Sequence, residues 1–412
     1  MAEITFKSAQ ELYRQEKYEA AFEQFVHLAD SKINPAFSSF LAGNALFNSS
    51  GNSEETWAWY TKALQFDDSN ALINREVERF ALAHNIVNPK QQTVLHYYPT
   101  TPNIGDSGSA AGIRSCINSL TDGLSFFTLS CRNDGIETIE KSGHNCSGII
   151  IGGGGLYFQQ PTPSGWYFPL TLSEVAMLKA PAVSFAVGFN RERSKNAAWD
   201  LNDAFIRKIA QYNNTFSLKS VRDTWSKRLL EKQGVTDLSL VPCPSMLLKP
   251  LVWYDLPVKD SPSLIGINLT ERSVKIEGKK AFFSHVLKFA DWLQEHGYTP
   301  LFIFQDCADD MGLAQMIADK GHAGILPHTA REAVTIYRQC DFVIGMRGHS
   351  LILAAGQCVP MLALSYNQKV DAFMDLLDMN EYCMDHEDIK SDHDLIFLFE
   401  KLVDNKDNLI AQ

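Results

Sequence analysis

The sequence has no long uninterrupted apolar run. Its most apolar stretch, Leu351–Leu364, contains Gln357 and Pro360 and is shorter than the roughly 20 apolar residues that a membrane-spanning helix needs. The amino-terminal residues are polar and amphipathic, without the apolar block of a signal peptide. The chain is therefore expected to be cytoplasmic.

An excess of positive charge is also missing. The chain has 37 Lys and Arg residues against 48 Asp and Glu residues, which gives a formal net charge of −11. General nucleic-acid-binding proteins and proteins that coat anionic membranes carry a basic surface field, so the composition argues against both classes. A small anionic ligand remains compatible, because a few Arg and His side chains in one cleft outweigh the net charge locally.

Closely spaced cysteines are also missing from the sequence. The eight cysteines lie far apart and none forms a C-x-x-C pair, which excludes zinc-finger and thioredoxin motifs. Scattered cysteines are typical of small buried side chains in a reducing cytosol. The acidic, histidine-containing tract at 385–394 resembles a metal site, but such charge runs are typical of solvated linkers. No metal is expected.

What the sequence does contain is, first, an amino-terminal region with helical periodicity. A shift of 35 residues largely repeats its aromatic and small positions, as in Phe25 to Tyr60 and Leu28 to Ala63. This resembles a pair of tetratricopeptide-type repeats, whose period is about 34 residues, while an ordinary helical bundle explains it equally well. Two repeats are too few to stand alone. Residues 1–90 are therefore expected to pack on the next domain and to serve packing or partner recruitment.

From Thr93 onward, short β-rich runs alternate with helical stretches, and a proline-bearing stretch at 242–262 separates two such series. This alternation predicts parallel sheets with right-handed crossovers. We predict an α/β protein with two Rossmann-like domains facing a cleft, at 91–248 and 249–385, and a helical tail at 386–412. The candidate strands are 93–98, 124–129, 148–151, 182–187, 216–218 and 238–241 in the first series, and 264–268, 300–304, 342–345 and 361–364 in the second.

Ligands of open parallel sheets bind beyond the carboxyl ends of the strands, so the residues that follow each strand are candidates. After the first strand, Gly105 and Asp106 open a helix, where Asp106 serves either as the N-cap or to orient a substrate hydroxyl. After the third strand, four glycines that include Gly153 and Gly154 let a backbone approach an anion closely. These glycines match neither the Walker A pattern nor the G-x-G-x-x-G pattern.

The fifth strand of the first series is followed by Arg222 and Asp223. Asp223 is suited to begin the next helix, and an Arg at this edge of the sheet can reach the cleft. A surface ion pair between the two side chains is the alternative.

The second series carries the densest group of candidate residues. A buried strand leads to Arg347, and His349 and Ser350 then begin an apolar helix. The next strand ends close to Tyr366 and Lys369. A guanidinium, an imidazole and a helix N-terminus at one point suit a phosphate or a carboxylate.

From about Thr93 to Met384, the order and content of these motifs resemble the polysaccharide pyruvyltransferase family. Three positions depart from the family pattern, because Gly348 replaces a Leu, Cys243 replaces the Asp of an Asp-Pro pair, and Cys358 replaces a turn glycine. The matching motifs are Gly105-Asp106, Gly152–Gly155, Val221-Arg222-Asp223, Arg347-x-His349 and Ser365-Tyr366-x-x-Lys369.

The resemblance implies transfer of a carboxyvinyl group from phosphoenolpyruvate to a sugar of a cell-surface polysaccharide or exopolysaccharide, or of its precursor. A pyruvate ketal closes across two hydroxyls, phosphate leaves, and no cofactor is needed beyond the phosphoenolpyruvate co-substrate. A lipid-linked acceptor would bring the protein to the inner face of the membrane. The implied catalytic residues are His349, Arg347, Asp106 and Arg222. The implied donor-binding residues are Gly153, Gly154, Ser350, Tyr366 and Lys369.

Two other functions stay open. A two-domain GT-B glycosyltransferase that uses a nucleotide sugar shares this architecture, and fold alone does not decide function. Such enzymes commonly place a carboxylate on the nucleotide ribose in the second domain, whereas no Glu occurs between Glu332 and Glu381 here. The other alternative is a non-catalytic glycan-binding or scaffold protein, which leaves the conjunction of Arg222, Arg347 and His349 unexplained.

Overall fold

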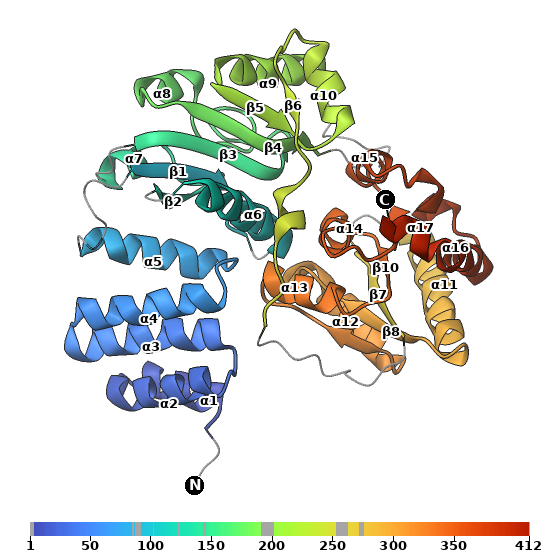
Figure 1. The fold of residues 1–412 in the computed structure, drawn as a ribbon, viewed down its shortest axis with the longest axis horizontal. Helices are drawn as coiled ribbons and strands as arrows, with labels where there is room; N and C mark the ends of the chain where they lie inside the picture. The colour runs from blue at the N-terminus through green and yellow to red at the C-terminus, as the bar shows by residue number, and fades with distance from the viewer. Residues whose placement is uncertain are drawn as a thin grey trace.

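The fold has three parts, an amino-terminal stack of helices and two α/β domains that each contain one parallel sheet (Figure 1). Among the described helices, none is long and apolar enough to cross a membrane. The computed structural model describes residues 4–84, 86, 92–101, 103–121, 124–142, 146–190, 202–252, 263–271 and 276–411.

The amino-terminal part consists of consecutive helices in which α2 packs on α3 and α3 packs on α4. Phe25 and Tyr60 are buried between these helices. Gly43 lets α3 and α4 approach closely, because a Cβ there would lie 2.6 Å from the Tyr60 ring. The tetratricopeptide assignment stays a prediction. The helices are α1 Phe6–Arg14, α2 Tyr18–Asp30, α3 Pro35–Ser50, α4 Ser53–Phe66 and α5 Ala71–Ala83.

The first α/β domain contains six parallel strands in the order β2-β1-β3-β4-β5-β6. The order reverses between β1 and β3, and such a switch point is where open sheets bind ligands. The strands are β1 Gln92–Tyr98, β2 Leu124–Ser130, β3 Cys146–Tyr157, β4 Ala182–Phe189, β5 Leu218–Val221 and β6 Ser239–Leu240. The helices are α6 Ile104–Leu120, α7 Ile136–Ser142, α8 Leu172–Met177, α9 Asp203–Thr215 and α10 Thr224–Glu231.

The second α/β domain follows the short 3-10 helix η1 (Pro244–Leu247) and contains six parallel strands in the order β12-β11-β10-β7-β8-β9. Its switch point lies between β7 and β10. The strands are β7 Leu264–Asn268, β8 Thr299–Ile303, β9 Ala323–Ile325, β10 Phe342–Gly345, β11 Met361–Ser365 and β12 Cys383–Asp385. The helices are α11 Ile276–Glu295, α12 Cys307–Asp319, α13 Ala330–Tyr337, α14 Gly348–Ala355, α15 Gln368–Leu376, α16 Asp392–Asp404 and α17 Lys406–Ala411.

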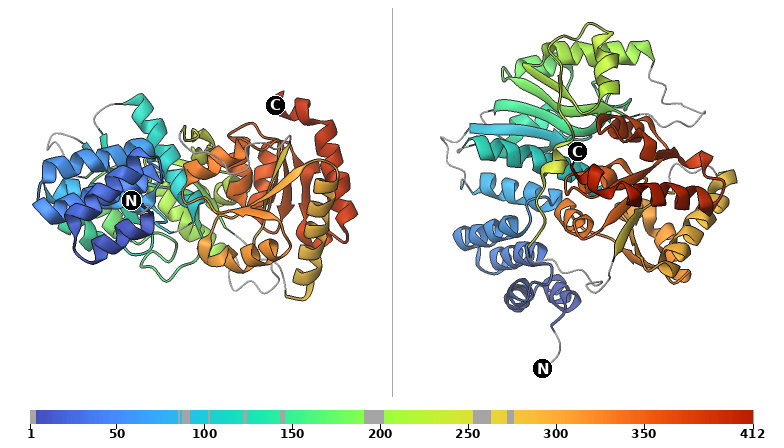
Figure 2. Two further views of the ribbon diagram at one scale, coloured as in Figure 1. Left: turned by 90° about the horizontal axis from the view of Figure 1, so that it is seen from below. Right: turned by 45° about the vertical axis from the view of Figure 1, so that its right-hand side comes forward.

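The hydrophobic pattern explains why the alternation was visible in the sequence. β7, β10 and β11 are buried along their whole length, as expected for parallel strands covered on both faces by helices. α16 packs on α11 and β11, and its Leu395 and Phe399 belong to the same hydrophobic core. The carboxyl-terminal helix therefore completes the second domain (Figures 1 and 2).

The predicted strand at 216–218 lies instead at Leu218–Val221, and β9 and β12 were not predicted. Two further boundaries and one predicted linker also differ from the structure. β3 does not end at residue 151 but continues through the four glycines, because Gly152 lets the strand lie close to β4: a Cβ there would be 2.1 Å from the Phe185 carbonyl oxygen. α6 begins at Ile104 rather than at residue 109. The tract at 385–394 is no solvated linker, because it forms a 3-10 turn and the start of α16, where Asp394 completes a capping box.

The amino-terminal helices contact both α/β domains. In α5, Glu78 forms a 2.7 Å ion pair with Arg114 of α6. In the turn between α4 and α5, buried Asp67 accepts a hydrogen bond from Thr329, the residue that caps α13 in the second domain. The helical region thus bridges the two domains on one side of the molecule (Figure 2).

Candidate active site

The helices that follow the two switch points are in direct contact. Gly105 lies in the first turn of α6, after β1, and His349 lies in the first turn of α14, after β10. A Cβ on Gly105 would lie 2.0 Å from His349 Nδ1, so the imidazole occupies the space that a side chain would fill. Only glycine fits at this position, and the candidate site therefore lies between the two domains.

Two side chains that precede the second domain in the chain contact the imidazole. Ser109 Oγ lies 3.4 Å and Cys243 Sγ lies 3.9 Å from His349 Nε2, and these two side chains are 3.1 Å apart. Ser109 Oγ donates its proton to the Gly105 carbonyl at 3.0 Å, which leaves its lone pairs for an N–H on Nε2. Sequence reasoning missed Ser109, and it noticed Cys243 only as a departure from the family pattern.

The pKa of His349 is lowered to about 3. Burial is the largest cause, followed by the positive charges of Arg222, Lys369 and Arg347. The imidazole is therefore neutral at pH 7. These charge effects also show that the structure brings together cations from both domains around one histidine.

Arg222 extends from the end of β5 into this space. Its side chain is 8% exposed, and its Nε lies 3.6 Å from Asp223 Oδ2. Two glycines clear the room for its guanidinium, because a Cβ on Gly188 would lie 2.6 Å from Nε and one on Gly155 would lie 3.0 Å from Nη2. Among the described residues, Nη2 has no hydrogen-bond partner. A buried guanidinium donor without an acceptor is costly, and an anionic ligand would satisfy it.

Asp223 caps α10, as the sequence predicted, and accepts a hydrogen bond from the Ser226 N–H at 2.6 Å. The alternative of a surface ion pair is wrong, because both Arg222 and Asp223 are buried.

Arg347 has a different environment from the one that the sequence suggested. Its Nη2 donates to Asp310 Oδ1 at 2.6 Å and lies 3.9 Å from Asp309 Oδ2. Its backbone N–H donates to Asn268 Oδ1 at 3.0 Å. Arg347 is thus anchored by a nearly fully buried carboxylate, and much of its charge is compensated within the protein.

Asp106 is not the N-cap of α6. Asn103 is the N-cap and accepts a hydrogen bond from the Gly105 N–H at 3.0 Å. Burial raises the pKa of Asp106 to about 6, while Lys369 and Arg222 lower it and Asp306 raises it. A Cβ on Gly154 would lie 3.0 Å from Asp106 Oδ1, so this carboxyl faces the glycine segment of β3. A carboxyl with a pKa close to neutral is suited to accept a proton from a hydroxyl.

The glycine segment is part of the sheet and not a turn beyond it. Gly152 pairs with Phe185 and Gly154 with Val187 in the ladder between β3 and β4, and Gly154 has a φ of +104°. Gly153 packs on Ser109, where an added Cβ would lie 3.0 Å from the Ser109 Cβ. These glycines bring the strand close to Ser109, Asp106 and Arg222.

The remaining predicted residues occupy the second-domain side. Ser350 is buried, and its hydroxyl donates to the Arg347 carbonyl at 2.6 Å, which closes the first turn of α14. Lys369 lies against Gly348, where an added Cβ would be 3.7 Å from Lys369 Cε. Tyr366 is half-buried against the core of the second domain. Within the described ranges, no group of three or more His, Cys, Asp or Glu residues is placed to hold a metal ion.

The fold and this interdomain site define a two-domain α/β protein of GT-B-like architecture. Two solved structures with the same architecture cover 78% of this chain and 90% of their own. They are a putative UDP-N-acetylglucosamine 2-epimerase from Listeria monocytogenes (13% identity, TM-score 0.53) and the S. aureus MnaA–UDP complex (10% identity, TM-score 0.51). At these identities the similarity concerns the fold alone.

The chain belongs to the polysaccharide pyruvyl transferase family, whose model matches residues 43–368. The match begins inside α3, whereas the sequence motifs predicted a resemblance only from about residue 93 to 384. Part of the amino-terminal helical region therefore belongs to the family pattern. No curated protein matches the chain.

Proposed function

We propose that the protein transfers the carboxyvinyl group of phosphoenolpyruvate to a sugar of a polysaccharide or its precursor and closes a pyruvate ketal across two hydroxyls. The observation that carries the proposal is the buried Arg222 Nη2, a charged donor without a partner among the described residues, beside a histidine that is surrounded by cations. A small dianion or trianion, with a carboxylate and a phosphate, satisfies this arrangement.

The three cationic side chains have different roles in donor binding. Arg222 offers a free guanidinium edge from the first domain, and Lys369 supplies a point charge from the second. Arg347 is held by Asp310, so its contribution is mainly to position the start of α14 and to add positive potential. The helix N-terminus at Gly348 adds a further partial positive charge.

The chemistry needs one acid and one base. The imidazolium of His349 delivers a proton to the methylene carbon of the donor, which leaves a cationic centre at the carbon that carries the phosphate. One acceptor hydroxyl attacks that carbon and passes its proton to Asp106, the carboxyl whose pKa is about 6. The bond between this carbon and the phosphate oxygen then breaks as the second hydroxyl attacks the carbon, the phosphate leaves with the proton of that hydroxyl, and the ketal ring closes.

The charge state of His349 follows from the donor. Before the donor binds the imidazole is neutral, because burial and three cations hold its pKa at about 3. A bound anion with two or more negative charges opposes those cations and raises the pKa. His349 thus becomes protonated on donor binding, so the general acid forms only when the donor is bound.

The acceptor is proposed to be a polysaccharide repeat unit or its precursor on the cytoplasmic side. A lipid-linked precursor would be met at the inner face of the membrane. The amino-terminal helices offer a surface for a partner protein or a second copy.

The experiment is incubation of the purified protein with phosphoenolpyruvate and a panel of glycans, with phosphate release as the readout. UDP-N-acetylglucosamine, with UDP release, is the matched arm for the nucleotide-sugar alternative. We expect phosphate release with phosphoenolpyruvate, and at least tenfold slower release at subsaturating phosphoenolpyruvate from Arg222→Lys, which keeps the charge but loses the guanidinium edge. UDP release without phosphate release would establish the alternative instead.

A further inference from the structure

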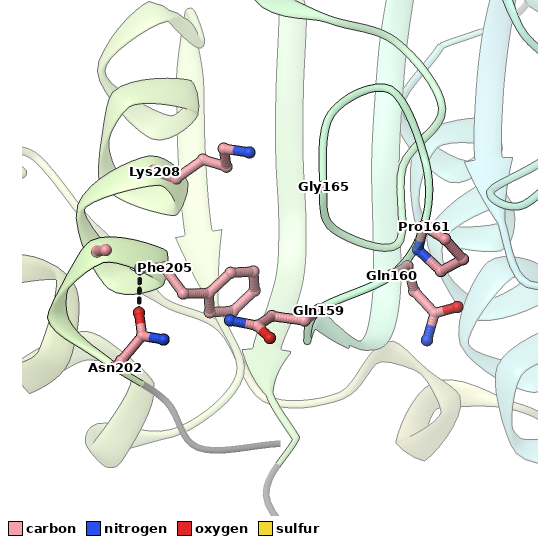
Figure 3. Close-up of a pocket in the computed structure, with 8 residues that line it drawn as sticks. Gln159, Gln160, Pro161, Gly165, Asn202, Phe205 and Lys208 are labelled. Carbon is pink, nitrogen blue, oxygen red and sulfur yellow. Dashed lines mark hydrogen bonds between the residues drawn. The ribbon is translucent and has the colours of Figure 1, made fainter. Parts of the chain in front are cut away.

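A second depression lies at the carboxyl edge of the first sheet, outside the interdomain site. It is formed between the segment that follows β3 and the amino-terminal half of α9, and its volume is about 540 Å³ (Figure 3). We call it the distal pocket, and the lining side chains that matter here are Gln159, Gln160, Pro161, Asn202, Phe205 and Lys208.

The lining of the distal pocket suits a polyhydroxylated ligand. Gln159, Gln160 and Asn202 are carboxamides, which both donate and accept hydrogen bonds as sugar hydroxyls do. Asn202 uses its oxygen on the Phe205 N–H at 2.8 Å, which leaves its amino group as a donor. Lys208 adds a cationic hydrogen-bond donor to this lining.

Figure 3 shows how these side chains lie. The carboxamide of Gln159 lies beside the Phe205 ring, and Lys208 extends from α9 toward the loop that contains Gly165. Gly165 leaves room for the ammonium group, because a Cβ there would lie 2.6 Å from Lys208 Nζ. An apolar ring next to amides and an amine is the combination that a sugar, with its C–H face and its hydroxyl rim, can fill.

The distal pocket and the interdomain site lie along the same strand. Gly155, beside Arg222 Nη2, is followed by four more residues to Gln159, which at about 3.3 Å per strand residue is at most about 13 Å. Asn190 lies along the same stretch, because its N–H donates to the Tyr157 carbonyl at 3.3 Å and its Cβ would lie 3.2 Å from a Cβ on Gly155. An oligosaccharide of a few units spans this distance, whereas a single sugar does not.

We propose that the distal pocket binds the sugar units of the acceptor glycan that neighbour the unit receiving the ketal. The inference rests on the proposed function, which supplies the glycan. Binding energy from such remote units positions the reacting hydroxyls without contact with the donor. The pocket would therefore select for chain length and linkage, while the interdomain site selects for the donor.

The test compares a tetrasaccharide of the panel glycan that the wild-type protein binds most tightly in donor-free calorimetry with the methyl glycoside of its accepting sugar. Gln159→Ala and Lys208→Ala should each raise KM for the tetrasaccharide about tenfold, the loss expected for one or two hydrogen bonds, and leave KM for the methyl glycoside and for phosphoenolpyruvate unchanged. The matched control is Arg207→Ala, a neighbouring exposed cation on α9 outside the pocket lining. This control should change neither KM.

A donor-free measurement separates this inference from the proposed function. Tetrasaccharide binding is titrated by calorimetry with wild type, Gln159→Ala and Lys208→Ala, each checked for folding by circular dichroism. Weaker binding in the two variants supports the pocket even when wild type releases no phosphate, in which case the proposed function alone fails. Equal tetrasaccharide binding and equal KM in wild type and both variants would overturn the inference.

Discussion

At the scale of single residues, the position of His349 depends on neighbours that no local sequence motif predicts. Gly105 is close to His349 only because β1 and β10 end at facing switch points, and Ser109 reaches Nε2 one turn further along α6. The Arg-x-His motif did predict an anion site at the start of a helix. It did not predict that Asp310 compensates the charge of Arg347, because Asp310 follows β8 whereas Arg347 follows β10.

Proton uptake on donor binding is the first prediction. The pKa of His349 is about 3 without the donor and should rise when the anionic donor binds, so we expect binding to consume a proton at pH 7 and donor affinity to fall as pH rises through the new pKa. Calorimetric titration of phosphoenolpyruvate in two buffers of different ionisation enthalpy measures the uptake. His349→Gln should abolish it and lower kcat by about 10²–10⁴. Unchanged uptake and near-normal kcat in His349→Gln would remove the general-acid role.

A second experiment should distinguish the role of Arg347 in stability from the role of Arg222 in donor binding. Arg347→Ala leaves Asp310, which is 1% exposed, without its ion-pair partner. The substitution should lower the free energy of unfolding by about 3–5 kcal/mol, the range for breaking a buried ion pair. Arg222→Lys should leave the melting temperature nearly unchanged and weaken phosphoenolpyruvate binding at least tenfold. Thermal unfolding and donor titration of both variants are the measurements. A stable Arg347→Ala protein with selectively lost donor affinity would restore the anion-clamp interpretation of that residue.

At the scale of elements, the alternation of strands and helices was predictable because buried parallel strands are continuous apolar runs. The start of α6 was not, because Gly105 and Gly108 have low helix propensity and look like loop residues. They are glycines for packing reasons, since a Cβ on Gly108 would lie 2.7 Å from the Ala330 Cβ of α13. The length of β3 was missed for the same reason, because glycines that allow close approach look like a turn.

One set of contacts links the amino-terminal helices to the glycine segment of β3. Arg114 Nη1 donates to Glu78 of α5 at 2.7 Å, and Arg114 Nε donates to His96 Nδ1 at 3.2 Å. His96 Nε2 then donates to the Gly152 carbonyl at 2.7 Å. Burial, with the charge of Arg114, lowers the pKa of His96 to about 3, so this ring stays neutral in that tautomer. The expectation that residues 1–90 serve only packing or recruitment does not include this support of Gly152 by α5.

Glu78→Gln should therefore affect the chemistry as well as stability. The substitution leaves the Arg114 charge uncompensated and loosens the contacts that hold Gly152 beside the site. We expect a lower melting temperature and a kcat reduced about tenfold at a temperature where circular dichroism shows full folding. Glu76→Gln, on the exposed face of the same helix, is the matched control and should change neither. A destabilised Glu78→Gln protein with normal kcat would show that these contacts stabilise the fold and do not support catalysis.

At the scale of the whole molecule, two sheets place their switch points against one another and the amino-terminal helices tie both domains together through Glu78 and Asp67. The sequence predicted the two-domain GT-B-like fold because each half repeats the β/α pattern. It could not predict the bridge, since Asp67 and Thr329 are separated along the chain and their pairing exists only in the folded protein. The two α/β domains thus form the site, and the amino-terminal helices contact both of them.

The most direct test of pyruvyl transfer at this site is product analysis in D₂O. Phosphoenolpyruvate with ¹³C at the carbon that carries the phosphate is incubated with the protein and the accepting glycan, and the glycan is examined by NMR. We predict a labelled quaternary ketal carbon whose methyl group carries one deuterium, since His349 exchanges its proton with solvent before delivering it, and no such product with His349→Gln. A glycan without label, or one that retains the methylene group of the donor, would contradict the account.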